Sequence, residues 1–518
     1  MRRVSLILMA VGLALSGHLY AASTNILLII ADDYGVDSSS LYNTNSSASL
    51  PPTPNIRSLA TNGVLFRSAY AYPSCSPTRS CILTGRYGFR TGIGQAIGEG
   101  GSQATLPLSE FTLPEALNAN PQLGYQHACI GKWHLSLDNT PTDPNVRGGW
   151  SVYSGALAGD VPNYTNWIKT VNGTVTPNYT NYATTDNVND ATNWISARGT
   201  NAWFLWLSFN APHKPFHKPP NALHSYDLLS GTQQDINTNS RPYFEAMTEA
   251  MDTEIGRLLA NVSLTNTLVI FVGDNGTTEE VIQPPFPVNR AKGTLYESGV
   301  RVPMIIAGAG VVNPGRESTV PTHCVDLYAT ILEAAGVNLS QTLPTNLTFD
   351  SQSLLPILRN TGTLDGRAVL CEHYGATSPN PAMPAGRCLR GPIHKLIQFQ
   401  SGTNEFYNVL LDPLELTNLL TRSLTAPETR AYDLLIAISS ALQSRPLLTP
   451  GNSSNQFSVT FNPVQLHTYT LQQLESLTMT NWTSLVSTTA PSSDANITLT
   501  NSVSGMTNGF YRLQVMMP

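Results

Sequence analysis

Side chains with metal-binding chemistry follow two apolar runs of this 518-residue chain. Asp32 and Asp33 come just after the run NILLII, and Asp274 and Asn275 come just after the run TLVIFV. Hard oxygen ligands of this kind suit calcium or magnesium rather than zinc. Asp32 and Asp33 alone would also fit a helix cap or a turn. Two such pairs, each at the end of an apolar strand, favour a site for a divalent cation.

A different chemistry is indicated by Cys75, which opens the segment CSPTRSCILTGR. By itself this cysteine would fit a buried thiol at a helix start, or a disulfide with Cys81. The segment closely resembles the sulfatase signature, Cys-x-Pro-Ser/Thr-Arg followed by Thr-Gly-Arg. It departs from the family at Cys81, where a small or apolar residue is usual. The resemblance implies a formylglycine-dependent (type I, Cys-type) sulfatase, arylsulfatase-like and within the alkaline phosphatase superfamily.

In that family the cysteine is oxidised after synthesis to formylglycine, an aldehyde. The resemblance therefore implies that Cys75 is modified by a formylglycine-generating or maturase enzyme before or during export. A hydrated aldehyde carries two hydroxyls on one carbon. One hydroxyl can attack sulfur and expel the alcohol, and the other, once deprotonated, can release sulfate as the aldehyde reforms. A plain serine or cysteine would be left sulfated and would need a separate hydrolysis.

The resemblance also assigns a metal site. An Asp-Asp pair after the first strand and a later Asp-Asn-Gly share one calcium ion in the family. Asp32, Asp33, Asp274 and Asn275 match these positions, so they are expected to hold one Ca²⁺ together with the modified side chain of Cys75 as a further ligand, with Mg²⁺ as the alternative. The ion would orient the sulfate oxygens and help to lower the pKa of a diol hydroxyl.

Two further blocks carry a lysine and two histidines. Residues 131–136 read GKWHLS and resemble the family block Gly-Lys-Trp-His-Leu-Gly, which implies that Lys132 binds a sulfate oxygen and His134 hydrogen-bonds the diol. His213 lies in APHKPF and resembles the family His-x-Pro. Its implied role is general acid to the leaving alcohol or a sulfate contact, and histidine suits this role because its pKa lies near working pH.

The remaining blocks complete the resemblance. Lys292 opens KGTLYESGVRVP, which implies a contact between Lys292 and the sulfate. Arg79 is expected to hold the aldehyde side chain and the metal-site carboxylates in place, and Arg301 to brace its loop. Residues 412–419 read DPLELTNL and match Asp-Pro-x-Glu-x-x-Asn-Leu. The resemblance therefore extends from about residue 25 to about residue 420.

The elements that position these residues alternate between strands and helices. Continuous apolar runs predict buried strands over residues 25–30, 203–209, 267–272 and 302–307. Residues 112–117, 243–259 and 324–335 have helical patterns. This alternation predicts an α/β fold with a mostly parallel sheet, in which ligands collect at the carboxyl ends of the strands. The resemblance implies an alkaline-phosphatase-like sulfatase core with a large, mostly parallel or mixed central sheet flanked by helices.

Four segments are predicted along the chain. Residues 1–22 are expected to be a signal peptide, 23–365 the catalytic domain, 366–445 a smaller α+β subdomain with an antiparallel sheet, and 446–518 a linker followed by a small β-sandwich-like module. The Pro/Gly/Ser/Asn-rich linker is placed at 446–455. Residues 138–182 are expected to form a loop-like insertion over the active face. Its aromatic residues either stack on sugar rings or pack in the core: Trp150, Tyr153, Tyr164 and Trp167.

Composition and charge argue against some classes of function. Charged residues make up 12% of the chain, against about 25% in average proteins, and the net charge is −6. No basic face for nucleic acid is visible. The apolar run near the start is too short to span a bilayer, which favours cleavage and a secreted or periplasmic protein without a membrane span. Of the six cysteines, Cys371 and Cys388 are a possible pair.

The sequence therefore predicts a sulfuric ester hydrolase acting on a sulfated carbohydrate or an aryl sulfate. One alternative is a phosphonate monoester or phosphodiester hydrolase with the same machinery. Another, from a different class, is a non-catalytic binder of sulfated glycans, against which the intact Cys75, Arg79 and both lysines argue. Oligomeric state is left open.

Overall fold

The computed structural model describes residues 24–98, 104–364, 366–374 and 384–442, together with six strands between residues 449 and 516. The predicted signal peptide, residues 1–22, lies outside the described residues. Within the described ranges, no helix is both long and apolar enough to cross a membrane.

A ten-stranded mixed sheet forms the centre of the molecule, with the strand order β11-β2-β10-β9-β1-β8-β4-β5-β6-β7. Strands β9, β1, β8, β4 and β5 run parallel to one another, whereas β10 and β6 are antiparallel to their neighbours. The strands are β1 (Asn25–Ala31), β2 (Gly63–Phe66), β4 (Gln126–Gly131), β5 (Val152–Gly155), β6 (Trp167–Val171), β7 (Thr174–Tyr179), β8 (Trp203–Ser208), β9 (Thr267–Gly273), β10 (Met304–Gly308) and β11 (Arg316–Ser318).

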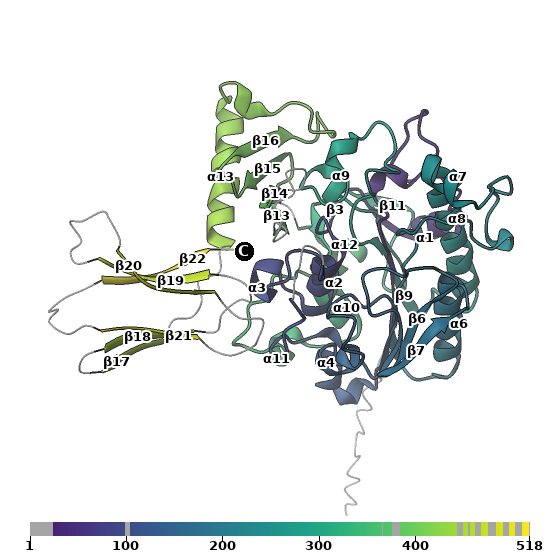
Figure 1. Ribbon diagram of the computed structural model, residues 1–518, viewed down its shortest axis with the longest axis horizontal. Coiled ribbons are helices and arrows are strands. Elements are labelled where there is room, and N and C mark those ends of the chain that lie inside the picture. The colour runs from purple at the N-terminus through teal and green to yellow at the C-terminus, as the bar shows by residue number, and fades with distance from the viewer. Residues whose placement is uncertain are drawn as a thin grey trace, which may run out of the picture.

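Helices cover both faces of this sheet (Figure 1). Alternate residues of β1 point into two hydrophobic cores, Leu28 into one and Leu27 into the other, which explains why the strand is apolar throughout. The Leu28 core is closed by α2 (Cys75–Thr84), α4 (Leu113–Asn118) and α10 (Asp326–Ala334). The Leu27 core is closed by α1 (Pro54–Thr61), α6 (Ala183–Ser196) and α8 (Ser240–Leu259).

Short elements connect the main ones. They are β3 (Ala69–Tyr70), β12 (Thr322–His323), α3 (Gly88–Thr91), α5 (Asp143–Val146), α7 (Gln233–Thr238), α9 (Glu297–Val300), α11 (Leu339–Thr342), α12 (Leu355–Leu358) and the 3-10 turns η1 (Val36–Ser38), η3 (Pro121–Leu123), η4 (Asn221–Leu223), η5 (Val288–Arg290) and η6 (Leu419–Thr421).

A second, smaller sheet follows the catalytic core in sequence. It is antiparallel, with the order β13 (Val369–His373), β14 (Gly386–Arg390), β15 (His394–Phe399) and β16 (Asn404–Asn408). The helix α13 (Ala426–Leu442) packs against β15. The predicted α/β class, with a large central sheet and a C-terminal subdomain with an antiparallel sheet, is confirmed.

The predicted loop-like insertion at residues 138–182 is wrong. It holds α5 and strands β5, β6 and β7, which extend the main sheet. These strands were missed because they are short and rich in polar residues. The four aromatic residues of this segment are at most 2% exposed and belong to the core, so none of them is a surface for sugar stacking: Trp150, Tyr153, Tyr164 and Trp167.

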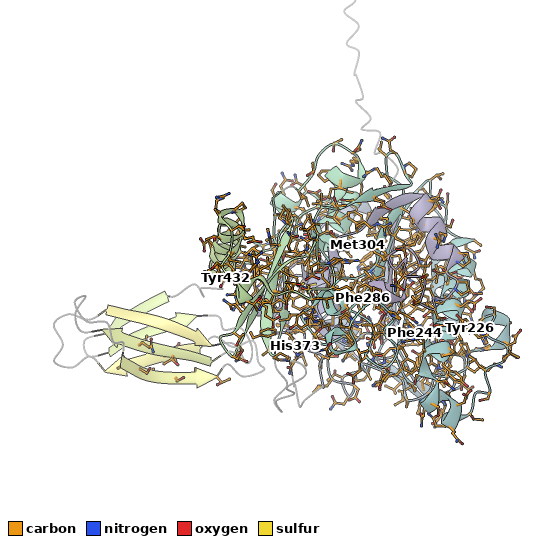
Figure 2. The ribbon with its side chains drawn as sticks, turned by 90° about the horizontal axis from the view of Figure 1, so that it is seen from above. Tyr226, Phe244, Phe286, Met304, His373 and Tyr432 are labelled. Carbon is orange, nitrogen blue, oxygen red and sulfur yellow. The ribbon has the colours of Figure 1, made fainter. Side chains whose placement is uncertain are left out.

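The last six strands form two three-stranded antiparallel sheets: β17 (Thr449–Ser453), β18 (Gln456–Phe461) and β21 (Ile497–Ser502) in one, and β20 (Thr483–Thr489), β19 (Thr468–Leu474) and β22 (Phe510–Met516) in the other. Two views show them at one side of the molecule, beside the C-terminal subdomain (Figures 1 and 2). Strand β17 lies inside the predicted linker. It is an edge strand, where Pro450 is tolerated because one side of the strand has no partner.

All six cysteines lie among the described residues and carry free thiols. The alternative of a Cys75–Cys81 disulfide is therefore wrong: the Cys81 thiol instead donates to the Thr78 carbonyl at 3.1 Å. Cys371 and Cys388 face each other across β13 and β14 but remain unbonded.

Candidate active site

The parallel strands bring the predicted metal ligands together. Ala31, at the end of β1, pairs with Gly273, at the end of β9, so Asp32 and Asp33 emerge beside Asp274 and Asn275. The Asp33 amide donates to Asp274 Oδ1 at 3.1 Å, and Asn275 Nδ2 donates to Asp33 Oδ1 at 2.7 Å. Residues 241 positions apart in the sequence thus form one buried group at the edge of the sheet where strand carboxyl ends collect ligands.

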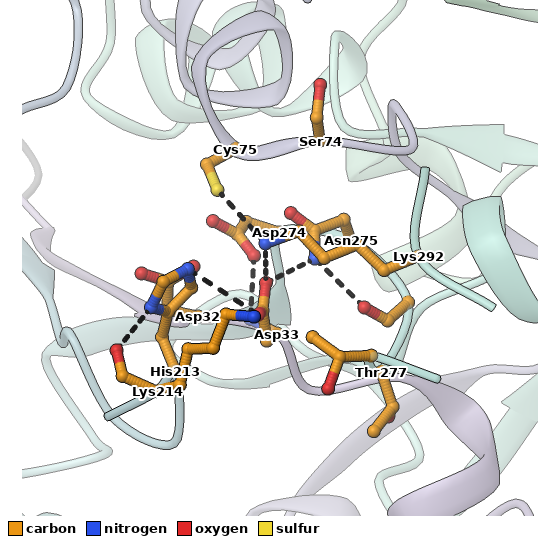
Figure 3. A network of polar contacts seen from close by, with 12 residues as sticks. Asp32, Asp33, Ser74, Cys75, His213, Lys214, Asp274, Asn275, Thr277 and Lys292 are labelled. Atoms are coloured by element: carbon orange, nitrogen blue, oxygen red, sulfur yellow. Dashed lines mark hydrogen bonds and ion pairs between the residues drawn. The ribbon is translucent and has the colours of Figure 1, made fainter. Parts of the chain in front are cut away.

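Lysine and histidine residues enter from the neighbouring strands. Lys132 follows β4, and His213 comes from the segment after β8, which lies next to β1. Lys292 comes from the loop before α9. Figure 3 shows Lys292 and His213 converging on Asp33, with Cys75 on the far side of Asp274.

Three ion pairs hold this group. Lys132 Nζ lies 2.5 Å from Asp32 Oδ2, Arg79 Nη2 lies 2.7 Å from Asp274 Oδ2, and Lys292 Nζ lies 2.5 Å from Asp33 Oδ1. Arg79 is fully buried and also donates to the Ser208 hydroxyl. The geometry fits the expectation that Arg79 holds the metal-site carboxylates, and its role stays a prediction.

Several acceptor atoms in the same group lack a partner. Among the described residues, Asp32 Oδ1, Asp33 Oδ2 and Asn275 Oδ1 are buried without a hydrogen bond. The ligand atoms of Asp32, Asp33 and His213 lie within 4.8 Å of one another, and so do those of Asp32, Cys75 and Asp274. Buried polar atoms are normally satisfied, and oxygen acceptors converging on one point are what a hard divalent cation requires. The residues present therefore fit Ca²⁺ or Mg²⁺.

The acids of this group respond differently to burial. For Asp33, burial acts to raise the pKa, but Lys292 and His213 outweigh it and hold the pKa well below its usual range. For Asp274, burial and the neighbouring Asp32 charge raise the pKa to about 6 despite Arg79. A bound cation favours ionised carboxylates, so it would lower the raised pKa of Asp274.

Cys75 is the first residue of α2, is 3% exposed and lies with its Sγ 3.8 Å from Lys292 Nζ. Burial raises the pKa of its thiol to about 12, although Lys132 and Lys292 act to lower it. The thiolate is the nucleophilic form of cysteine, and the raised pKa disfavours that form. This position therefore suits a chemically converted side chain better than ordinary cysteine catalysis.

Burial disfavours the protonated form of both histidines. Burial lowers the pKa of His213 to about 4, against the effect of Asp33. Burial and the nearby Lys132 hold the pKa of His134 well below its usual range. His213 Nδ1 lies 2.7 Å from the Lys214 carbonyl, which assigns the proton to Nδ1 and leaves Nε2 as an acceptor, 3.7 Å from Asp33 Oδ2. Sequence reasoning considered His213 as an acid or sulfate contact and missed it as a potential metal ligand.

A pocket of about 320 Å³ opens above these groups, and its walls include Cys75, His134, His213 and Lys292. Four further wall residues were missed by sequence reasoning because none of them belongs to a recognised motif: Asp160, Glu279, Glu280 and His373. The available signal for the two glutamates was their position, a few residues after the metal-ligand motif at Asp274. His373 shows that the C-terminal subdomain contributes to the pocket.

The fold and this site define an α/β protein with a buried group of carboxylates and cations at the strand ends. The chain belongs to the sulfatase family: the model described as "Sulfatase" matches residues 24–337, more than half of the chain. A second model, "N-sulphoglucosamine sulphohydrolase, C-terminal", matches residues 290–432. The resemblance found in the sequence is confirmed, including its place in the alkaline phosphatase superfamily.

Relatives with named activities span part of the chain. Arylsulfatase A of Bos taurus is 30% identical over 374 residues, covering 68% of this chain and 71% of the bovine protein. Arylsulfatase J of Mus musculus is 26% identical over 337 residues, covering 62% of this chain and 54% of the mouse protein. The chain thus matches about half of the length of the mouse relative.

Solved structures show the same fold. Ps i-CgsB in complex with k-i-k-neocarrahexaose has a TM-score of 0.68 and 22% identity, with 81% of this chain and 93% of that chain covered. The phosphonate monoester hydrolase of Agrobacterium radiobacter has a TM-score of 0.57 and 20% identity, with 81% and 96% covered. At these identities the likeness concerns the fold alone, which sulfatases and phosphonate hydrolases share.

Proposed function

We propose that this protein hydrolyses sulfate esters to inorganic sulfate and an alcohol, using formylglycine made from Cys75 beside one Ca²⁺. The observation that carries the proposal is the convergence of Cys75 with three cation–carboxylate pairs that leave three oxygens unpartnered. Membership of the sulfatase family supports sulfate as the group that is removed.

Asp32, Asp33, Asp274 and Asn275 would hold the cation, with the modified side chain of residue 75 facing it. When bound, the cation supplies positive charge that orients sulfate oxygens and favours deprotonation of a bound hydroxyl. Calcium is proposed from the resemblance to the family, because carboxylate and amide oxygens by themselves suit Ca²⁺ and Mg²⁺ alike.

The side chains around the cation each have a proposed task. Lys132 and Lys292 donate to non-bridging sulfate oxygens and stabilise charge that grows during S–O cleavage. His134, whose Nδ1 is buried and without a partner among the described residues, hydrogen-bonds the hydrate at position 75. His213 lines the pocket. In its protonated form, with a proton on Nε2 as well as on Nδ1, it would pass a proton to the leaving alcohol or donate to sulfate. Arg79 holds Asp274 in place.

The local charge suits a sulfate ester. Three lysine and arginine charges balance Asp32, Asp33 and Asp274, so a divalent cation makes the site positive in a chain whose net charge is −6. A pocket with low-dielectric walls concentrates this field. Anion binding therefore needs no basic surface.

The substrate is proposed to be a sulfated carbohydrate, with an aryl sulfate as the simpler alternative. Asp160, Glu279 and Glu280 also line the pocket, and Glu280 pairs with Lys214 at 3.3 Å. Carboxylates accept hydrogen bonds from hydroxyls, and they repel a second sulfate in the same pocket. The proposal includes export to the periplasm or medium and modification of Cys75 by a formylglycine-generating or maturase enzyme.

The test uses protein produced with a competent modifying enzyme. Mass spectrometry of the peptide that contains Cys75 is expected to show the aldehyde. Sulfate release from 4-nitrophenyl sulfate and from a panel of sulfated sugars is expected to disappear in Cys75→Ala. Cys81→Ala is the matched control, because it removes another buried thiol from the same helix and is expected to keep activity. Retained activity in Cys75→Ala, or an unmodified thiol in active protein, would overturn the proposal.

The same protein distinguishes the rival activities. A phosphonate monoester and a phosphodiester are assayed beside the sulfate esters. A higher kcat/KM for either phosphorus ester would favour the phosphonate or phosphodiester hydrolase. Tight binding of a sulfated glycan without any turnover would favour the non-catalytic binder.

A further inference from the structure

A second buried charge cluster joins the catalytic core to the C-terminal subdomain. Lys395 Nζ, on β15, lies 3.2 Å from Glu297 Oε1 and 3.0 Å from Glu415 Oε1. Glu297 opens α9 in the core, and Glu415 lies in the turn after β16. Lys395 and Glu415 are fully buried, and Glu297 is 2% exposed. One lysine thus bridges two carboxylates from two parts of the chain.

The segment from Arg290 to Glu297 is attached to the turn at Glu415 by both of its ends. At one end, Arg290 Nη1 donates to the Leu414 carbonyl at 2.7 Å and to the Glu415 carbonyl. At the other end, the Glu297 amide donates to Glu415 Oε2 at 2.6 Å. Lys292 lies between these two attachment points.

The turn that makes these contacts is itself rigid. Asp412 accepts the amides of Leu416 and Thr417, at 3.0 and 2.7 Å, and Asn418 Oδ1 accepts the Phe406 amide of β16 at 3.1 Å. The acidic and amide residues of the DPLELTNL block therefore have distinct tasks. Asp412 closes the turn, Asn418 fixes it to the sheet, and Glu415 reaches the core.

Lys292 has little freedom to adjust. Its amide donates to the Thr277 carbonyl at 2.9 Å, the next amide, of Gly293, donates to the Pro73 carbonyl at 2.9 Å, and its Nζ contacts Asp33 at 2.5 Å. Pro73 and Thr277 stand two residues from Cys75 and from Asn275, respectively. A displaced segment would therefore move Lys292 relative to both candidate catalytic groups, and a shift of about 1 Å can cost about 100-fold in rate.

We infer that Glu415 is a positioning residue for the reaction: its side chain, through the Glu297 amide and Lys395, fixes the end of the segment that presents Lys292 to the sulfate, while Arg290 binds the main chain of the same turn. The C-terminal subdomain thereby completes the active site from behind, without touching the substrate at this point. This inference rests on the proposed function for its kinetic readout, and on the contacts above for its structural one.

A double-mutant cycle tests whether Glu415 acts through Lys292. Glu415→Gln, Lys292→Ala and the double variant are assayed for kcat and KM on 4-nitrophenyl sulfate. Glu415→Gln alone is expected to lower kcat by about 10- to 100-fold. In the Lys292→Ala background the same change is expected to alter kcat less than about twofold, because Lys292 is no longer there to misplace. Equal losses in both backgrounds would overturn the inference.

Hydrogen exchange gives a readout independent of activity. In Glu415→Gln the amides of Lys292 and Gly293 are expected to exchange at least about tenfold faster, while amides of the central strands β1 and β9 keep their wild-type rates. Unchanged exchange at Lys292 and Gly293 would overturn the inference. If wild-type protein has no sulfatase activity, the proposed function fails while this measurement still decides the structural claim.

Arg367→Gln is the matched control. Arg367 makes a buried ion pair with Asp326 of α10, with N–O distances of 2.8 and 3.0 Å, and so also joins the subdomain region to the core. Among the described residues, no hydrogen bond or ion pair joins Arg367 to residues 290–297, and its loss is expected to lower the melting temperature without changing kcat or exchange at Lys292. A loss of kcat in Arg367→Gln equal to that in Glu415→Gln would mean that any weakened interdomain contact suffices, which would overturn the inference.

Discussion

Two of the buried charge clusters among the described residues differ in how their carboxylates are paired with cations. In the cluster at the strand ends, Asp32, Asp33 and Asp274 each lie within 2.7 Å of a different cationic side chain, and within the described part of the chain three oxygens of that cluster have no hydrogen-bond partner. In the cluster between the domains, Lys395 is shared by Glu297 and Glu415. The first cluster borders a pocket, and the second is closed from solvent.

The first cluster is suited to binding an ion and a substrate, and the second is suited to positioning a segment of the chain. In the first cluster, three side-chain cations balance three carboxylates. A bound divalent cation would therefore leave a net positive charge, which favours the binding of an anion. The second cluster has two carboxylates for Lys395, with Arg301 3.4 Å from Glu297, and burial raises the pKa of Glu415 to about 7. It is buried and its residues do not line the pocket, so its role is to fix two segments against each other.

The largest effect is expected from removing the cation from the strand-end cluster. After dialysis against a chelator, sulfate release is expected to fall at least about 1,000-fold, because the charge that stabilises the transition state is lost. Activity should return with Ca²⁺ and less fully with Mg²⁺, and elemental analysis should show one ion per chain. Asp32→Asn is expected to weaken the recovery by Ca²⁺. Full activity in protein shown to be metal-free would contradict the binding role of this cluster.

Replacing one lysine in each cluster should give opposite signatures. Lys395→Met leaves Glu297 and Glu415 without their shared cation, so the free energy of unfolding is expected to fall by about 3–5 kcal/mol. Lys132→Met is expected to abolish most activity but to lose less stability when Ca²⁺ is present, because Arg79 Nη2 lies 3.9 Å from Asp32 and the ion adds positive charge. Chemical denaturation at one Ca²⁺ concentration measures both variants. Equal losses of unfolding free energy in Lys395→Met and Lys132→Met would contradict the distinction between a binding cluster and a positioning cluster.

Much of the core could be predicted from local sequence. The strands at residues 25–31 and 267–273 are apolar on both faces and end at acids, which is the pattern of buried parallel strands. The helix at 113–118 was marked by Thr112 and Glu115, which form a capping box in the structure. The proposed site residues belong to short motifs, so their types were recognisable before their positions were known.

What escaped prediction depends on contacts between distant segments. Strands β5 to β7 carry polar side chains, and Lys169 of β6 is stabilised by Asp186 and Asp190 of helix α6. The pairing of Glu297 with Glu415 joins residues 118 positions apart, and Asp160 reaches the pocket only through the fold. No local pattern encodes such proximities.

Glu372, a buried carboxylate outside both clusters, tests a case in which burial raises the pKa more than the nearby Arg387 lowers it. It accepts hydrogen bonds from the Phe89 amide at 3.0 Å and the Tyr72 hydroxyl at 3.2 Å, and burial raises its pKa from 4.5 to about 7. Because the folded state holds this proton more tightly than the unfolded state, its contribution to stability is complete below pH 4.5 and is lost as the pH rises through 7.

Glu372→Gln is therefore expected to flatten the fall in unfolding free energy between about pH 5 and pH 8. The difference from wild type should be at most about 3 kcal/mol, from the pKa change at 1.36 kcal/mol per unit. Denaturation curves at several pH values measure it. An unchanged slope would show that Glu372 is ionised in the folded protein and is compensated in the way the two clusters are.

The smallest effect is expected from a substitution at Gly159 that displaces the His134 side chain. A methyl group on Gly159 would lie 2.5 Å from His134 Cε1 and 2.6 Å from its Nε2, so Gly159→Ala must displace the imidazole and weaken its 3.0 Å contact with the Ile97 carbonyl. We expect kcat to fall about tenfold, since a misplaced catalytic group loses rate steeply, while the melting temperature stays near that of wild type. Gly362→Ala, whose new methyl would meet Pro356 Cβ at an ordinary 3.4 Å, is the control and should be silent. If Gly159→Ala kept full kcat, then the position of the His134 ring would not matter to the reaction, and the role proposed for it would fail even with the rest of the cluster intact.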